Sequence, residues 1–307
     1  MSATRCLYSL SRSTLLQRLG GEGICLRIPP FVMRIRSPIP VVAEGLAVLY
    51  ADHELLEPAD SHFADFHVAV LPRWRGAKRV CVFQMDGAQP FTPLAIGEAF
   101  ALLEWGMNWC VTSHTHRLLT IHSAVLEKRG HVMILPAPPG SGKSTLCAAL
   151  MLSGWRLLSD EMALLDPQTG FILPAPRPVS LKNRSIEVIQ AFDPKAVMGP
   201  VAHDTVKGRV AHLKVSSHSL AQAAVSAPPA WLVFPLYDAD AGLQVNERPK
   251  AQALVNLASN SFNHHVHGRS GFEALAQVVG RSACHDLRYG DLSIALAWFD
   301  ALEPQAT

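Results

Sequence analysis

A chain of 307 residues, 49% of them hydrophobic and 17% charged, can bury a sizeable core, which excludes a disordered protein and fits one large or two smaller domains. Its net charge of +2 and the absence of a basic block argue against nucleic acid as a partner. No apolar stretch has the length of a membrane span, and the six cysteines lack the spacing of a metal knuckle or a redox pair. These features predict a cytoplasmic protein with free thiols and no membrane contact.

The first residues are basic and rich in serine. Residues 1–21 contain Arg5, Arg12 and Arg18 but no acid, a composition compatible with an organelle transit peptide. A short amphipathic helix over residues 11–19 that packs on the fold is the alternative, and it is slightly favoured. Residues 1–23 are therefore treated as an N-terminal extension.

Periodic patterns next predict a small N-terminal α/β unit over residues 24–112. Its expected strands cover residues 24–28, 31–36, 65–71 and 79–85. Its expected helices cover residues 41–50 and 94–110. No pattern in this unit points to chemistry of its own.

Residues 113–307 are predicted to form a second domain. Its first elements are strands at 118–127 and 131–136, a helix ending at 153, a strand running into residues 160–161 and a hairpin over 163–174. An extended proline-rich segment, a helix at 183–192 and a mobile loop at 193–210 follow. The last elements are a strand at 231–236, helices at 250–262 and 272–280, a strand at 283–288 and a helix at 292–302. Residues 263–267 contain three histidines, but no second ligand group has metal spacing, so a solvated loop is expected there.

A glycine-rich segment joins the strand at 131–136 to the helix that follows. Its expected phosphate-binding residues are Ala137, Pro138, Pro139, Gly140, Ser141, Gly142, Lys143, Ser144 and Thr145. The two glycines let backbone N–H groups turn toward phosphate oxygens, and the lysine can reach the β- and γ-phosphates. Ala137 stands where the full pattern has glycine, which is a small departure. The segment therefore predicts a nucleotide-binding P-loop.

Two acids, Asp160 and Glu161, stand at the end of the next strand. A metal-binding acid is expected at such a strand end, beside the phosphates. We expect Ser144 and Asp160 to hold Mg²⁺ and Glu161 to accept the proton of an attacking hydroxyl. Because side chains alternate along a strand, both acids can face one site only if the strand ends before them. The alternative is a solvated pair of acids.

The spacing of these motifs resembles that of HPr kinase/phosphorylase and, more closely, of the HPr-kinase-related kinases called HprK-related kinase A. In that family a histidine lies 21 residues before the P-loop lysine and two acids lie 17 and 18 residues after it; here these are His122, Asp160 and Glu161 around Lys143. Residues 101–110, 135–145, 180–182 and 207–212 are also similar to the related kinases. Glu161 replaces an aspartate of the parent family, and the parent's signature for phosphorolysis is absent.

The resemblance implies an α/β fold with a P-loop kinase core of the HPr kinase and PEP carboxykinase-like type, and ATP and Mg²⁺ as cofactors. It implies a small protein or ribosomal peptide as acceptor, phosphorylated on Ser or Thr, and it is compatible with a homo-oligomer. The expected catalytic residues are Glu161, Asp160, His122 and Lys143. The expected cations for the acceptor or the phosphates are Lys182, Lys207 and Arg209.

Other interpretations of the same residues, structural as well as functional, stay open. A lone histidine such as His122 within an apolar strand is usually a satisfied core residue. A kinase for a small metabolite would carry the same loop and acids. A nucleotide-sensing module without phosphoryl transfer would keep Lys143 and Ser144 but would not need Glu161.

Overall fold

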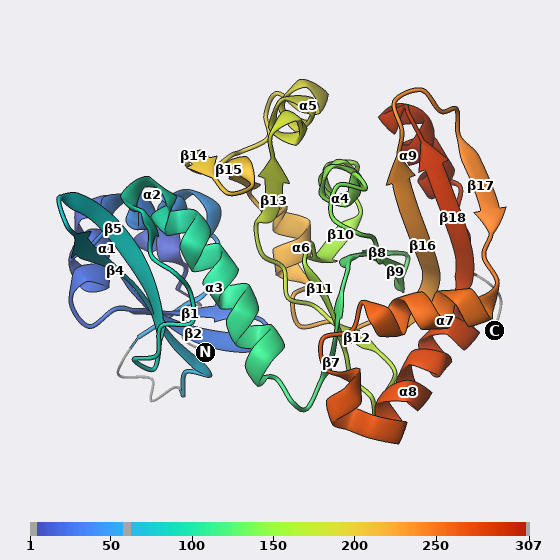
Figure 1. Ribbon diagram of the computed structural model, residues 1–307, viewed down its shortest axis with the longest axis horizontal. Helices are drawn as coiled ribbons and strands as arrows, with labels where there is room; N and C mark the ends of the chain where they lie inside the picture. The colour runs from blue at the N-terminus through green and yellow to red at the C-terminus, as the bar shows by residue number, and fades with distance from the viewer. Residues whose placement is uncertain (1–4, 58–62, 305–307) are drawn as a thin grey trace. The chain divides into compact units, whose positions relative to one another are not determined.

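The computed structural model describes residues 5–57 and 63–304, and the chain in it folds into two compact units. The first unit comprises Met1–Val111 and Arg177–Leu220, and the second comprises Thr112–Pro176 and Ala221–Thr307. Both are mixtures of helices and sheets, as expected for an α/β protein (Figure 1). Residues 177–220, predicted to belong with the glycine-rich loop, pack instead with the N-terminal unit.

The first unit is built on a six-stranded sheet of order β3-β1-β2-β4-β5-β6. Its strands are β1 (Ile24–Ile28), β2 (Phe31–Arg36), β3 (Leu55–Leu56), β4 (Phe66–Arg75), β5 (Lys78–Met85) and β6 (Leu94–Ala95). Of the strand pairs described in this sheet, β2 with β4 is parallel and the others are antiparallel. Helix α3 (Ala99–His114) packs on this sheet, and helix α2 (Pro40–Leu49) packs on α3, since Gly45 of α2 lies against the Phe100 ring. Gly106 of α3 lies so close to Phe83 of β5 that a Cβ there would come within 2.0 Å of its ring.

The N-terminal segment forms a short 3₁₀ helix, η1 (Leu7–Ser9), and the helix α1 (Arg12–Gly20). Ser11 caps α1, because its hydroxyl accepts a hydrogen bond from the Thr14 N–H at 3.1 Å. Leu15 and Leu19 are buried. The prediction of a packed helix over residues 11–19 is therefore confirmed. Residues 1–4 of the predicted N-terminal extension lie outside the described residues.

The returning segment of the first unit adds a three-stranded sheet of order β13-β15-β14 and the helix α5 (Arg184–Phe192). Its strands are β13 (Val179–Lys182), β14 (Ala202–Thr205) and β15 (Gly208–Leu213), followed by the helix α6 (Ser217–Ala221). The prediction of a mobile loop over residues 193–210 was therefore wrong. Thr205 explains the hairpin, since its hydroxyl accepts from the Lys207 N–H at 3.0 Å and donates to the Gly208 carbonyl at 2.6 Å. Such a local side-chain turn carries no hydrophobic periodicity.

A buried ion pair ties the returning segment to the first unit. The Arg177 guanidinium donates to the Glu104 carboxylate at 2.6 Å, and the Tyr50 hydroxyl donates to the same carboxylate at 2.7 Å. Arg177 also donates to Asn108 at 2.7 Å. Burial, reinforced by the Glu104 charge, raises the pKa of Tyr50, so its hydroxyl stays a donor. This contact between α2, α3 and residue 177 explains why residues 177–220 belong with the first unit.

The second unit is built on a six-stranded sheet of order β10-β8-β9-β16-β18-β17. Its strands are β8 (Ala124–Lys128), β9 (His131–Leu135), β10 (Arg156–Ser159), β16 (Pro229–Tyr237), β17 (Gln244–Glu247) and β18 (Ala283–Tyr289). Strands β9, β16 and β18 are parallel neighbours, so their carboxyl ends meet at one edge. A second sheet of order β12-β11-β7 contains β7 (Leu119–His122), β11 (Met162–Leu165) and β12 (Ile172–Leu173).

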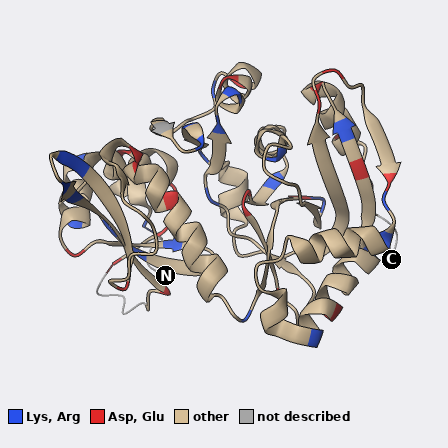
Figure 2. Cartoon of the chain, viewed as in Figure 1, with Lys and Arg blue, Asp and Glu red and all other residues tan. Residues whose placement is uncertain are grey.

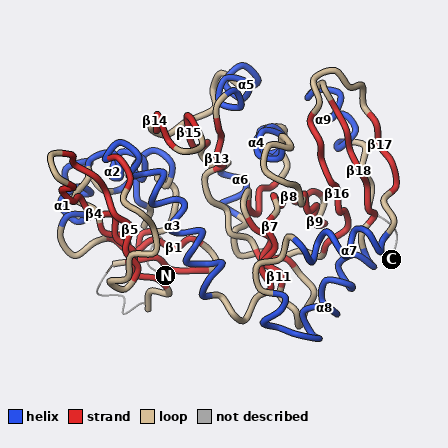
Figure 3. The backbone as a smooth tube through the Cα atoms, in the orientation of Figure 1, coloured by secondary structure: helices blue, strands red, loops and turns tan. Residues whose placement is uncertain are grey.

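Helices cover both faces of the six-stranded sheet. Leu257 of α7 (Lys250–Ser259) and Leu275 of α8 (His264–Arg281) share a buried cluster with Ile134 of β9, and the two helices lie side by side (Figure 3). On the other face, Trp155 packs edge-on against Trp231 of β16 and Phe299 of α9 (Leu292–Asp300). None of the helices in the described ranges is both long enough and apolar enough to span a bilayer.

Residues 263–267 are not the solvated loop that was predicted, because helix α8 begins at His264. Asn263 anchors this start: its side chain accepts from the Thr120 N–H at 2.9 Å and donates to the Leu118 carbonyl at 2.9 Å. Gly268 takes a non-helical conformation, with φ 56° and ψ −130°, and kinks the helix. This polar run can therefore be helical because its first residue, the buried Asn263, is bonded to the backbone of residues 118 and 120.

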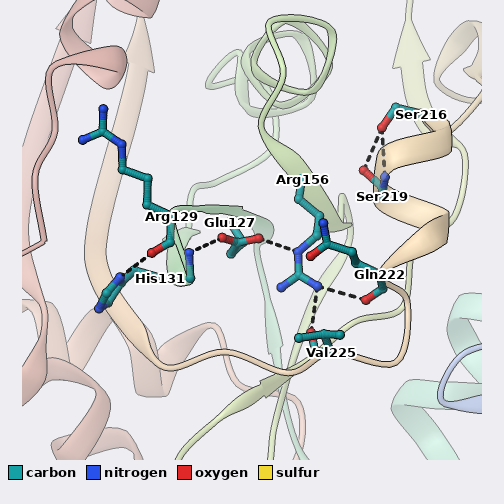
Figure 4. A network of polar contacts seen from close by, with 9 residues as sticks. Glu127, Arg129, His131, Arg156, Ser216, Ser219, Gln222 and Val225 are labelled. Carbon is teal, nitrogen blue, oxygen red and sulfur yellow. Dashed lines mark hydrogen bonds and ion pairs between the residues drawn. The ribbon is translucent and has the colours of Figure 1, made fainter.

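A second buried ion pair lies in the second unit (Figure 4). The Arg156 guanidinium donates to the Glu127 carboxylate, which in turn accepts the Gly130 N–H. The same guanidinium donates to the carbonyls of Gln222 and Val225 at 2.9 and 2.8 Å. Only 2% of the Arg156 side chain is exposed. The pair therefore joins β8, β10 and the segment 222–225 below the surface.

Candidate phosphate-binding site

Two chain segments connect the three-stranded sheet and the six-stranded sheet of the second unit. One passes from β7 to β8 through Ser123, and the other passes from β10 to β11 through Asp160 and Glu161. The two crossings touch, since the Ser123 N–H donates to the Glu161 carbonyl at 3.3 Å. The single strand predicted for residues 118–127 was therefore wrong: it is two strands that belong to different sheets.

The ends of these strands decide where the two acids lie. Strand β10 ends at Ser159, whose hydroxyl accepts the N–H groups of Glu161 and Met162 at 3.3 and 3.2 Å. Asp160 and Glu161 thus follow the strand, and the alternation of strand side chains does not apply to them. Asp160 is buried and Glu161 is half-buried. The sequence condition for both acids to face one site, a strand that ends before them, is met.

The glycine-rich loop lies between β9 and the helix α4 (Lys143–Leu152). Gly140 and Gly142 have φ values of 88° and 85°, which favour glycine. The Tyr237 N–H at the end of β16 donates to the Ser141 carbonyl at 2.9 Å. A Cβ on Gly142 would lie 2.7 Å from the Cβ of Tyr237 and 3.2 Å from the hydroxyl of Tyr289. The ends of β16 and β18 therefore support the loop from beneath and require glycine there.

Helix α4 directs two side chains toward the strand-end acids. Lys143 is buried, and its ammonium donates to the backbone carbonyl of Asp160 at 2.8 Å. Cys147, one turn further along the helix, forms a hydrogen bond with the Asp160 carboxylate. Burial raises the pKa of the Cys147 thiol well above its ordinary value, and the Asp160 charge raises it further, so the thiol is the donor. The lysine, the thiol and the acid form one buried group under the loop.

The structure places some of the predicted site residues together within the second unit. Lys143 contacts the backbone of Asp160, Glu161 follows Asp160 in the chain, and His122 pairs with Met162, the residue after Glu161. His122 is half-buried and meets the Phe262 ring edge-on at 5.9 Å.

The three predicted cations belong to the first unit, which does not contain the loop: they are Lys182, Lys207 and Arg209. There, Lys207 lies over the Trp105 ring at 5.2 Å, and Arg209 pairs with Glu187 at 2.6 Å. These two contacts account for Lys207 and Arg209 without any ligand.

Three residues of this site escaped the sequence analysis: Cys147, Tyr237 and Tyr289. The position of Cys147 four residues after Lys143 places both on one helix face, so this signal was present in the sequence. Tyr237 and Tyr289 stand about 90 and 150 residues away and reach the loop only because β9, β16 and β18 are parallel neighbours.

The donor groups of the loop fit a phosphate. Within the described part of the chain, the buried Ser141 hydroxyl makes no hydrogen bond, and no side chain caps the first turn of α4. No acid lies in that turn either. A helix start with open N–H groups and an uncapped positive dipole end favours an anion.

Mg²⁺ fits only together with a bound phosphate. Ser144 of α4 and the carboxylate of Asp160 would supply oxygen ligands of the kind that this cation prefers. Among residues 5–57 and 63–304, no group of three or more His, Cys, Asp or Glu side chains is arranged to hold a metal ion. The remaining ligands would therefore come from phosphate oxygens and water.

No protein-family model matches the chain, and no curated protein matches its sequence. The arrangement of loop, lysine and strand-end acids is therefore the basis for any functional conclusion. It can bind an anionic phosphate chain, neutralise its charge and present a carboxylate beside it.

The support of the loop by Tyr237 leads to a first prediction. Gly140→Ala should cost about 1–2 kcal/mol of unfolding free energy, because alanine is strained at positive φ but has open space there. Gly142→Ala carries the same strain and also overlaps Tyr237, which adds about 1–3 kcal/mol. Urea unfolding of both variants measures the difference. Equal losses at the two positions would show that Tyr237 does not constrain the loop.

Proposed function

We propose that the chain is an ATP-dependent phosphotransferase with a P-loop kinase core of the HPr kinase and PEP carboxykinase-like type. It transfers the γ-phosphate to a hydroxyl, a Ser or Thr of a small protein or ribosomal peptide. The observation that carries this proposal is the hydrogen bond by which Lys143, at a glycine-rich loop that opens a helix, holds the backbone of the strand-end acid Asp160, the neighbour of Glu161. The spacing similarity to HPr-kinase-related kinases supports the acceptor class.

The loop and Lys143 hold the nucleotide in this proposal. The N–H groups at the start of α4 bind the phosphate chain, and the Ser141 hydroxyl gains a partner there. Lys143 exchanges the Asp160 carbonyl for a phosphate oxygen, since both are acceptors for its ammonium. Ser144 and Asp160 hold Mg²⁺, which supplies neutralisation of the charge on the phosphoryl oxygens.

The two acids have different roles because their surroundings differ. Asp160 is buried, hydrogen-bonded with Cys147 and close to Lys143, so it is suited to a fixed metal ligand. Glu161 is half-buried and is held through its backbone by Ser123 and Ser159. Its carboxylate is therefore the group that accepts the proton of the attacking hydroxyl, and His122, which pairs with Met162, orients the acceptor.

The test measures transfer from γ-labelled ATP in the presence of Mg²⁺ to pools of peptides and metabolites. Lys143→Ala should lower transfer by about 10²–10³-fold, because it removes a charge that acts on the phosphates. Lys250→Ala is the matched control: Lys250 also donates to a backbone carbonyl, that of Gly280 at 2.6 Å, but on the exposed surface of α7. This control should keep wild-type transfer.

The acceptor that takes the label decides between the remaining functions. Label on a peptide supports the proposal, and label only on a metabolite identifies a small-molecule kinase. If the nucleotide binds and no label reaches any acceptor or water, the chain is a nucleotide-sensing module and the proposed transfer is wrong.

A further inference from the structure

The outer face of the first unit's six-stranded sheet, opposite the core, gathers cationic side chains. Pairing places Arg34 beside His67 and Arg36 beside Ala69, while Ile35 and Val68, which alternate with them, are buried. Along β4, two-residue steps continue this face from Ala69 to the end of the hairpin. We call the resulting surface the outer sheet face, and it is defined by Arg34, Arg36, His67, Arg73, Arg75 and Lys78. Figure 2 shows cations gathered at the end of the β4–β5 hairpin.

The cations of this face differ from other arginines of the same unit in their partners. Arg5, Arg18 and Arg27 form ion pairs with Glu54 or Glu57. Among the described residues, no carboxylate lies within ion-pair distance of Arg34, Arg36, Arg73, Arg75 or Lys78. A surface with five cations that have no carboxylate partner within residues 5–57 and 63–304 attracts an anionic partner.

Two of these arginines are held in place by the backbone. The Nε–H groups of Arg34 and Arg36 donate to the carbonyls of Glu22 and Gly21, each at 3.0 Å. These bonds fix both side chains, so the Nη groups can bind a ligand with little further loss of side-chain entropy. Because a guanidinium can donate two parallel hydrogen bonds, such groups recognise carboxylates well.

The arginines border a depression that is longer than a single small-ligand pocket. Arg34, Arg36, His67 and Gln84 line a cavity of about 610 Å³. A second cavity of about 620 Å³ shares Gly21, Glu22 and Arg34 with the first. The two are therefore neighbours, and together they fit an extended chain.

The acids on this surface are fewer than the cations. Glu22 and Asp86 also line the first cavity, and Glu22 and Glu57 line the second. Glu57 is already paired with Arg5 and Arg18. Against Glu22 and Asp86 stand two arginines in the first cavity and the three cations Arg73, Arg75 and Lys78 further along β4 and β5. The balance over the face is positive, so an acidic ligand is favoured over a neutral one.

We propose that the outer sheet face binds an acidic polypeptide segment in an extended conformation. Arginines two residues apart on a strand lie about 6.6 Å apart, the same interval at which an extended peptide presents alternate side chains. Carboxylates at alternate residues of the partner can thus pair with Arg34 and Arg36 and, further along, with Arg73 and Arg75. This binding is separate from the nucleotide site and does not depend on phosphoryl transfer.

The composition of the face disfavours two other anionic partners. Single-stranded nucleic acid binds through stacking on aromatic rings, yet among the described residues the face carries no Phe, Tyr or Trp. Trp74, which is 70% exposed, pairs with Arg79 on the opposite side of the hairpin. An anionic membrane would meet a hollowed surface rather than a flat one. Both partners serve as competing outcomes in the test.

The test measures binding of a fluorescent peptide of alternating Glu and Gly to the full chain. Arg34→Gln/Arg36→Gln should weaken binding about tenfold, because two guanidinium–carboxylate contacts are lost. Arg269→Gln/Arg281→Gln removes the same charge from α8 and should leave the affinity within about twofold of wild type. Circular dichroism and thermal melting check that the variants fold. If the first variant does not fold, Arg73→Gln/Arg75→Gln tests the same face at exposed positions.

Several outcomes would overturn the proposal. A peptide of alternating Gln and Gly should not bind, so equal affinity for the two peptides contradicts it. Equal weakening by the α8 variant would show that only net charge matters. Tighter binding of a single-stranded RNA or of phosphatidylglycerol vesicles than of the acidic peptide, lost in the same variant, would assign the face to that partner instead.

Discussion

Glu161→Gln should lower phosphoryl transfer by about 10²–10⁴-fold, because an amide cannot accept the proton of the attacking hydroxyl. Nucleotide binding should stay within a factor of about two, since the contacts assigned to the phosphates come from the loop and Lys143. The backbone of Glu161 keeps its bonds to Ser123 and Ser159 in the variant. Transfer from γ-labelled ATP and binding of a fluorescent ATP analogue, measured on the same preparation, separate the two effects.

The control for this variant is Glu273→Gln, which removes an exposed carboxylate from α8 and should keep the wild-type rate. Asp160→Asn differs in its readout, because it should weaken the dependence on Mg²⁺ rather than proton transfer alone. If Glu161→Gln transfers phosphate at the wild-type rate, Glu161 is not the base. The solvated-pair interpretation of the two acids would then gain.

Arg156→Met should destabilise the second unit by about 3–5 kcal/mol, the cost of leaving a buried charge without its partner. Glu127 would keep its bond from the Gly130 N–H but lose the guanidinium, and the carbonyls of Gln222 and Val225 would lose their donor. Urea unfolding measures the loss. Hydrogen–deuterium exchange should show the faster opening in residues 222–226.

Two variants bracket this result. Arg269→Met breaks the exposed ion pair between Arg269 and Glu273, which lie one turn apart on α8, and should cost at most about 0.5 kcal/mol. Arg156→Met/Glu127→Gln removes both charges and should recover part of the loss. If Arg156→Met lowers the unfolding free energy no more than Arg269→Met does, the buried ion pair does not stabilise the second unit.

Much of the fold follows from local patterns. The helix predicted at 41–50 is α2 (Pro40–Leu49), and the strands predicted at 65–71 and 79–85 are β4 and β5. These elements have strong periodicity and clear turn residues, such as the Asp86-Gly87 turn after β5. Segments that depend on a distant side chain could not be predicted. The histidine-rich start of α8 depends on Asn263 reaching β7, and the grouping of residues 177–220 depends on Arg177 reaching Glu104.

The candidate site was predictable to a similar depth. The loop, Lys143 and the two acids stand in a recognisable order along the chain, and the structure joins Lys143 directly to the Asp160 backbone. The break at Ser123 was not predictable, because no Gly or Pro in residues 119–128 marks a turn and only the pairing partners change. The same holds for Tyr237, whose contact with Gly142 depends on the order of strands in the sheet.

The chain passes between its two units after Val111, Pro176 and Leu220. During synthesis on the ribosome, the first unit therefore cannot gain its last strands until residue 220 has emerged, long after its N-terminal sheet. By then the glycine-rich loop and the two acids have also been made, while β16 and β18 have not. No single proteolytic cut releases either unit intact. The first unit is therefore completed while the second unit is still being synthesised.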